Sequence, residues 1–119
     1  SYTTFRFSDI TLNRSSIGMD NELVASVTVT NTGDRAGSEV VQLYIRDLVG
    51  SVTRPVKELK GFEKIYLQPN ESRTVRFTIA PEMLKFYNAD LKFVAEPGDF
   101  DVMIGPDSRN VKTARFTLR

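Results

Sequence analysis

The chain has 119 residues, and its 16 Lys and Arg side chains against 15 Asp and Glu give a formal net charge of +1. This balance excludes the strongly basic patches with which proteins hold nucleic acid or a membrane surface. The sequence contains no Cys and no His, which excludes disulfides, Cys-ligated zinc, Ser-His-Asp triads and imidazole metal ligands.

The N-terminal part of the chain predicts three β-strands separated by turns. Residues 5–12 form a first strand with an irregularity around Ser8 and Asp9. Residues 23–31 alternate apolar and polar side chains with a period of two, which is the pattern of a half-buried strand. A turn over residues 31–37, rich in Asn, Asp and Gly, leads into the next strand at 41–45.

The rest of the chain predicts further short strands around one long loop. This loop, over residues 47–56, leads into a strand at 59–67 whose alternation breaks at Gly61, which indicates a β-bulge. Residues 81–84 begin with Pro81 and form one helical turn. The other strands expected here are, in chain order, 75–79, irregular pieces over 86–93, 100–104 and 114–118.

Seven to eight short strands with no long amphipathic helix predict an all-β fold. The pattern is typical of an antiparallel immunoglobulin/fibronectin type III-like β-sandwich that takes up residues 1–119 as a single domain. The phase shared along each strand predicts the core, which consists of Phe7, Leu23, Val27, Val29, Val41, Leu43, Ile45, Ile65, Leu67, Val75, Phe77, Val102, Ile104 and Phe116.

Acidic side chains offer the remaining route to catalysis or metal binding. Asp99 and Asp101 share one strand face and form the best local carboxylate pair for glycoside hydrolysis, although adjacent carboxylates on an exposed strand are usually solvated charges. A calcium ion would need several oxygen ligands, which Glu96, Asp99, Asp101 and Asp107 could supply. The EF-hand loop pattern is absent, so no metal or cofactor is expected.

Three aromatic residues lie off the core phase, namely Tyr44, Phe62 and Tyr66. Exposed rings of this kind can stack on sugars, or they can pack across strands or against a neighbouring domain. Packing is favoured because Trp, a common platform for sugar stacking, does not occur in the sequence.

Four ordered blocks and the N-terminus carry a resemblance to a known domain type. The blocks read VTVTNTGDRAGSEVVQLY at 27–44, SVTRPVKELKGF at 51–62, LQPNE at 67–71 and EPGDFDVMIG at 96–105, and the N-terminus reads SYTTF. In these blocks the chain resembles the C-terminal fibronectin type III-like domain of glycoside hydrolase family 3 enzymes, of the bacterial periplasmic β-glucosidase type. Asn70 stands where this pattern usually has glycine, and Asn tolerates left-handed backbone.

The resemblance implies that the chain is a fragment of a larger multidomain enzyme, and its first residue, Ser1 rather than Met, is expected of a piece of a longer protein. The parent would be a retaining β-glucosidase whose catalytic Asp and Glu lie on a (β/α)₈ barrel and an α/β sandwich. No position of this chain matches those motifs, so the chain alone is expected to hold no catalytic residue and to hydrolyse nothing.

The resemblance therefore implies a non-catalytic accessory domain that packs against the two catalytic domains of its parent, in a periplasmic or extracellular location. Two other roles remain open from the sequence. One is a carbohydrate-binding module that holds oligosaccharide near the parent's active site, and the other is a free-standing adhesion domain.

The segment from Asp47 to Phe62 is the expected docking surface. Long loops often carry function, and Arg54 before Pro55 favours an extended backbone that presents a guanidinium to a carboxylate. Phe62 lies off the core phase and is expected to face outward. The predicted interdomain docking residues are Arg54, Pro55, Lys57 and Phe62. The alternative is a solvated loop, with Arg54 paired locally and Phe62 returned to the core by the bulge.

Overall fold

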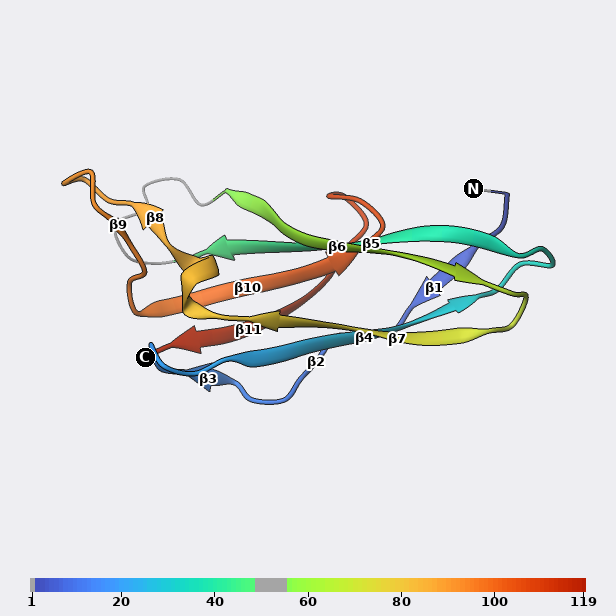
Figure 1. Ribbon diagram of the computed structural model, residues 1–119, viewed down its shortest axis with the longest axis horizontal. Helices are drawn as coiled ribbons and strands as arrows, with labels where there is room; N and C mark the ends of the chain where they lie inside the picture. Colours follow the sequence, from blue (N-terminus) through green and yellow to red (C-terminus); the bar gives the residue numbers. More distant parts are fainter. Residues whose placement is uncertain (1, 49–55) are drawn as a thin grey trace.

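Two β-sheets share one apolar core, and their strands run along the long axis of a molecule that measures 53 by 25 by 16 Å (Figure 1). The structure is a computed structural model that describes residues 2–48 and 56–119. Within these residues the elements are, in chain order, β1 (Phe5–Phe7), β2 (Thr11–Leu12), β3 (Ser16–Ile17), β4 (Leu23–Asn31), β5 (Gly37–Asp47), β6 (Lys57–Leu67), β7 (Ser72–Ile79), the 3₁₀ turn η1 (Pro81–Leu84), β8 (Phe86–Tyr87), β9 (Phe93–Val94), β10 (Gly98–Gly105) and β11 (Lys112–Leu118).

The first sheet is built around β4. Strand β7 pairs with one edge of β4, while β1 and β2 pair with the other edge at its two ends, all antiparallel. The break between β1 and β2 confirms the irregularity predicted around Ser8 and Asp9. The amide of Thr28 donates to the Ser8 hydroxyl there, so the side chain occupies the gap in the ladder.

The second sheet has the strand order β3-β11-β10-β5-β6, which makes β10 a central strand and β6 an edge strand. All its pairs are antiparallel except β3 with β11, which run parallel. A separate hairpin of β8 and β9 projects at the end of the molecule far from the N-terminus (Figure 1). The all-β sandwich is confirmed. The described strands outnumber the seven to eight expected because the first one is divided and β3, β8 and β9 are two-residue strands.

The core is close to the predicted one. All predicted core residues are buried except Phe7 and Phe77, which pack against the core and stay partly exposed. Phe77 lies on β7, which among the described strands pairs only with β4 and so forms an edge of its sheet. The sequence pattern missed some buried members of the core, which include Ile17, Ile79, Leu84, Phe100 and Leu118.

Asn31 is a fully buried polar residue that joins three parts of the chain. Its side-chain oxygen accepts hydrogen bonds from the Thr3 hydroxyl at 2.8 Å and the Gly33 amide at 3.0 Å. Its side-chain nitrogen donates to the carbonyls of Arg35 at 2.7 Å and Leu67 at 3.0 Å. Every hydrogen-bonding group of the buried amide therefore has a partner, which is the condition for burying it at low cost.

No helical segment of the described residues is long and apolar enough to cross a membrane.

Candidate docking surface

Strand β6 changes its phase at Gly61, and this change directs Phe62 out of the core. A Cβ atom on Gly61 would lie 3.7 Å from the ring of Phe77 and 3.8 Å from Cδ2 of Leu43, so position 61 faces the core. Phe62 faces the other way and is 69% exposed. The predicted bulge is confirmed at this place, between Leu43 and Tyr44 of the partner strand. The alternative in which the bulge returns Phe62 to the core is wrong.

The same bulge brings Leu59 to the outer face of the sheet. Leu59 lies opposite Tyr44 and Phe62 lies opposite Gln42, and these two partners on β5 are two residues apart and so share a face. Leu59 is 53% exposed, and Tyr66, four residues after Phe62, is exposed on this face as well. The edge strand thus presents three exposed apolar side chains on this face, Leu59, Phe62 and Tyr66, with the exposed Lys64 between the last two. We call the three apolar residues the β6 apolar line.

Next to the β6 apolar line, charged residues lie opposite one another on three neighbouring strands of the same sheet, β5, β10 and β11. Asp101 on β10 is opposite Arg46 on β5 and opposite Arg115 on β11. Its Oδ2 is 3.0 Å from Nη2 of Arg46, and its Oδ1 is 3.3 Å from Nε of Arg115. The carboxylate therefore has one cation on each side.

Asp101 is only 4% exposed, so the expectation of two solvated carboxylates at Asp99 and Asp101 is wrong for Asp101. It faces outward, but it lies on a central strand where long side chains from both neighbouring strands cover it. Asp99 accepts a hydrogen bond from the Thr117 hydroxyl at 2.7 Å. The two carboxylates are thus bound to different partners, Asp101 to two arginines and Asp99 to Thr117.

The outer face of the other sheet is polar. The hydroxyls of Thr28 and Thr74 are 3.2 Å apart across β4 and β7, and those of Thr30 and Ser72 are 2.7 Å apart. Among the residues that the structure describes, none of the large exposed apolar side chains lies on β1, β2, β4 or β7. The two outer faces therefore differ, and the face that carries β6 is the better candidate for protein contact.

The predicted docking residues fall into two groups. Arg54 and Pro55 lie outside the described residues. Lys57 is the first residue of β6, and its Nζ donates to the carbonyl of Ser108 in the turn before β11. Residues 57–62 belong to a strand, so the expectation of a loop that reaches Phe62 is corrected, although Phe62 does face outward. The docking role of these residues stays a prediction.

Sequence reasoning missed Leu59, Arg46 and Arg115 as members of this surface. Leu59 shares the parity of the core residues Ile65 and Leu67, and only the bulge reverses its direction. The two arginines come together only through strand pairing between β5, β10 and β11, which no local pattern in the sequence reveals.

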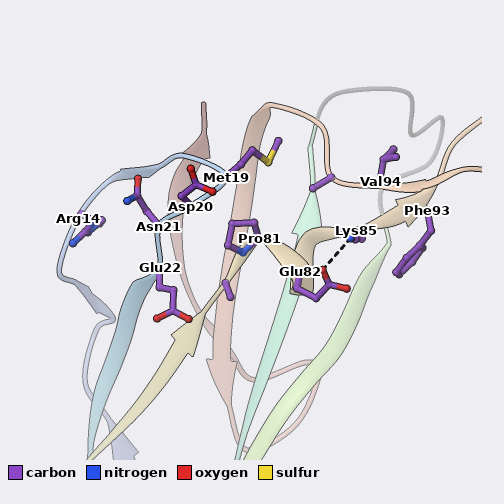
Figure 2. A pocket seen from close by; sticks show the side chains of 12 residues that line it. Arg14, Met19, Asp20, Asn21, Glu22, Pro81, Glu82, Lys85, Phe93 and Val94 are labelled. Carbon is purple, nitrogen blue, oxygen red and sulfur yellow. Dashed lines mark ion pairs between the residues drawn. The ribbon is translucent and has the colours of Figure 1, made fainter.

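A depression of about 860 Å³ lies at one end of the sandwich, between the turn before β4, the 3₁₀ turn and β9. Figure 2 shows Arg14, Asn21 and Glu22 on one side and Phe93 on the other, with Pro81 between them. The remaining lining residues are Met19, Asp20, Ala80, Glu82, Lys85, Val94 and Ala95. Glu82 is paired with Lys85 at 2.9 Å.

The conceivable calcium ligands do not gather around a common point. No group of three or more acidic side chains that could hold a metal ion occurs in residues 2–48 and 56–119. Asp107 instead accepts hydrogen bonds from the side chain of Asn110 and from the backbone amides of Asn110 and Arg109. These bonds lower the pKa of Asp107 below its ordinary value, and the bond from the Asn110 side chain has the largest effect. They also close the turn between β10 and β11.

Comparison with known proteins shows a single domain type. The family model of the fibronectin type III-like domain matches residues 39–108. The periplasmic β-glucosidase of Salmonella typhimurium is 53% identical over 118 residues, which cover 99% of this chain and 15% of that protein. A β-xylosidase of Formosa agariphila is 44% identical over 121 aligned positions, which cover all of this chain and 17% of that protein.

A solved structure of a β-glucosidase from Erythrobacter marinus superposes with a TM-score of 0.92 and 47% identity, covering 99% of this chain and 16% of that one. The chain thus spans only a small part of the proteins that it matches. It belongs to the fibronectin type III-like domain family, and it is similar to the domain of this type in β-glucosidases, as the resemblance to glycoside hydrolase family 3 predicted.

Proposed function

We propose that this chain is a non-catalytic accessory domain of a larger glycoside hydrolase of family 3, and that it packs against the catalytic domains of the same polypeptide. The parent is a β-glucosidase that hydrolyses terminal β-D-glucosyl residues with retention. The observation that carries the proposal is the β6 apolar line, an exposed apolar edge in a domain whose relatives are several times longer. Several exposed apolar side chains on one strand face are typical of a surface that another protein part covers.

The chemistry of the acidic side chains supports an accessory role. Retaining glycoside hydrolysis needs two carboxyl groups about 5 Å apart on either side of the scissile bond. Asp101 is instead neutralised by two arginines, and Glu82 is paired with Lys85. We expect the chain alone to leave aryl β-glucosides intact, and turnover that disappears in a single carboxylate variant of the purified chain would contradict this.

A periplasmic or extracellular location is part of the proposal. It is supported by the Salmonella typhimurium relative, which is a periplasmic β-glucosidase. Fractionation of the parent's native host, followed by detection of the protein in the periplasm or medium, tests it.

The docking role is tested in the full-length parent with the double variant Leu59→Ser and Phe62→Ser. Loss of two buried apolar contacts should weaken the attachment of the domain and lower the melting temperature by roughly 2–5 °C. Met19→Ser is the matched control, because Met19 is a similarly exposed apolar side chain outside the β6 apolar line. Equal melting temperatures for the double variant and the control would refute docking through this surface.

Carbohydrate binding is the second candidate function, and the depression at the end of the sandwich favours it. Phe93 is 49% exposed at its wall, opposite the polar side chains of Asn21 and Glu22 (Figure 2). An aromatic face with polar groups opposite it suits the apolar faces and hydroxyls of a sugar. Isothermal titration of the parent with cello-oligosaccharides should then show a second site that Phe93→Ala removes, and a single site in both proteins would reject this role.

A further inference from the structure

Four charged residues on neighbouring strands of the five-stranded sheet lie opposite one another on its outer face. Strand pairing places Lys57 opposite Arg46 and Arg46 opposite Asp101. Asp101 in turn lies opposite Arg115. Three cations accompany one carboxylate, so the four side chains together carry a net charge of +2. We call these four residues the arginine row.

The buried carboxylate of Asp101 fixes the directions of the two arginines. Its side chain is 5% exposed, and it contacts Nη2 of Arg46 at 3.0 Å and Nε of Arg115 at 3.3 Å. A carboxylate removed from water is tolerated only when cations and hydrogen bonds compensate it. Each guanidinium is therefore held through one of its nitrogens, Nη2 in Arg46 and Nε in Arg115.

Arg115 has guanidinium nitrogens that are available to bind a ligand. Its side chain is 62% exposed, and Asp101 uses only its Nε. Among the residues that the structure describes, the two terminal nitrogens of Arg115 contact no acceptor. Such a pair of parallel donors matches the two oxygens of a carboxylate. Because Asp101 already restrains the side chain, less conformational entropy is lost when a ligand binds.

Arg46 is the less accessible of the two arginines, because its side chain is 36% exposed. Its Nε is buried and finds no acceptor in the described part of the chain. Buried donors are nearly always satisfied in folded proteins, so a buried donor without a partner calls for an explanation. Because this atom is buried, a ligand from outside would not reach it, and Arg46 would act on an anion at the arginine row through its charge.

We infer that the arginine row binds an acidic side chain, Asp or Glu, from another domain of the parent polypeptide. This inference rests on the proposed function. The next outward-facing pair along β5 and β6 is Tyr44 with Leu59, so apolar side chains lie beside the cationic ones. Arginine and aromatic residues are combined in this way at the centres of protein interfaces. The chain covers only 15% of its Salmonella relative, which leaves ample surface in the same polypeptide. A neutral glucoside would not neutralise the row.

The test uses hydrogen–deuterium exchange of the full-length parent and three variants of single arginines. Arg115→Gln removes both the positive charge and the paired N–H donors of the guanidinium. Arg115→Lys keeps the positive charge but lacks the paired donors. Arg76→Gln is the matched control, because Arg76 is an exposed arginine on the outer face of the other sheet, where it lies opposite Ser26. Arg115→Gln should raise exchange roughly fivefold in an acidic segment outside residues 1–119. Arg115→Lys should restore part of the protection, and Arg76→Gln should change nothing there.

Each other outcome overturns the inference. Faster exchange confined to β10 and β11 would mean that Arg115 serves only its own sheet. Equal exchange in Arg115→Gln and Arg76→Gln would mean that no acidic partner lies on the row. If the variant with Leu59→Ser and Phe62→Ser still loosens the parent in that case, the docking proposal stands without the acidic partner. If it does not, both proposals fail.

Discussion

The carbonyl oxygen of Asn110 occupies the place where a side chain on Gly105 would begin. A Cβ atom built on Gly105 would lie 1.9 Å from this oxygen, a distance that no pair of non-bonded atoms can adopt. Gly105 ends β10, and Asn110 stands just before β11, so the two strands approach each other at this point without any room for a methyl group. The glycine is required by close approach of two backbone segments.

Gly105→Ala should therefore destabilise the domain, because the obstacle is backbone and the whole turn must move. We expect a loss of about 2–3 kcal/mol in the free energy of unfolding. Gly61→Ala is the control, since its Cβ would meet Phe77 and Leu43 at ordinary contact distances of 3.7 and 3.8 Å. It should change stability by less than about 1 kcal/mol. Denaturant unfolding of both variants measures the difference, and similar losses would contradict the steric argument.

Deletion of Lys60 tests the bulge in β6. Lys60 is the residue without a partner in the pairing of β5 and β6, and the pairs on both sides of it can stay in register when it is removed. Its ion pair with Glu58 is long, at 3.6 Å, and Glu58 is exposed, so its loss matters little. We expect the deletion to change the free energy of unfolding by less than about 1 kcal/mol.

Deletion of Glu63 is the contrasting variant. Glu63 is paired with Val41, so its removal shifts one half of β6 by one residue and exchanges its inner and outer faces. The cost should exceed about 2 kcal/mol, because Gly61 and Phe62 would exchange their environments. Equal stability of the two deletion variants, measured by denaturant unfolding, would show that Lys60 is not the extra residue.

The sequence predicted what depends on local alternation. The bounds of β4 follow from its strict period of two, and the turn at Pro81 follows from the position of proline. Strand β3 has only two residues, so it has no period, and it is stabilised by parallel pairing with a strand about one hundred residues later. Sheet order is likewise invisible to a local pattern.

The site shows the same limit. Alternation along β10 indicates which side chains face outward, and outward-facing residues are exposed only when neighbouring strands do not cover them. Asp101 is covered from both sides by Arg46 and Arg115, so it is buried although it faces outward. Phe62 lies on an edge strand, and its exposure could be predicted.

The pKa of Asp107 gives a prediction that depends on pH. Hydrogen bonds from the side chain of Asn110, which has the largest effect, and from the backbone amides of Asn110 and Arg109 lower this pKa in the folded state. A lowered carboxyl pKa stabilises the fold above the pKa of the unfolded chain, about 3.9, and this contribution is lost as the pH falls through the folded-state pKa. In Asn110→Ala the pKa of Asp107 should rise towards its ordinary value. NMR titration of the carboxyl carbon measures it, and an unchanged pKa would contradict the assigned cause.

Asn31→Ala should be among the most destabilising polar substitutions in the domain. It leaves the Thr3 hydroxyl and the Gly33 amide without this acceptor, and it leaves the carbonyls of Arg35 and Leu67 without this donor. Because the site is fully buried, water cannot replace all four bonds, and we expect a loss of about 3–4 kcal/mol in the free energy of unfolding.

Thr3→Val separates one of these bonds from the rest and provides the matched comparison. It removes the 2.8 Å bond to Asn31 and should cost about 1 kcal/mol. Since Thr3→Val and Asn31→Ala remove the same bond, the double variant should cost less than the sum of the two by about 1 kcal/mol. Denaturant unfolding of the four proteins in this cycle measures the coupling. If the two losses in the free energy of unfolding were strictly additive, the bond between Thr3 and Asn31 would contribute nothing. Asn31 would then stabilise the domain only through its bonds to Gly33, Arg35 and Leu67.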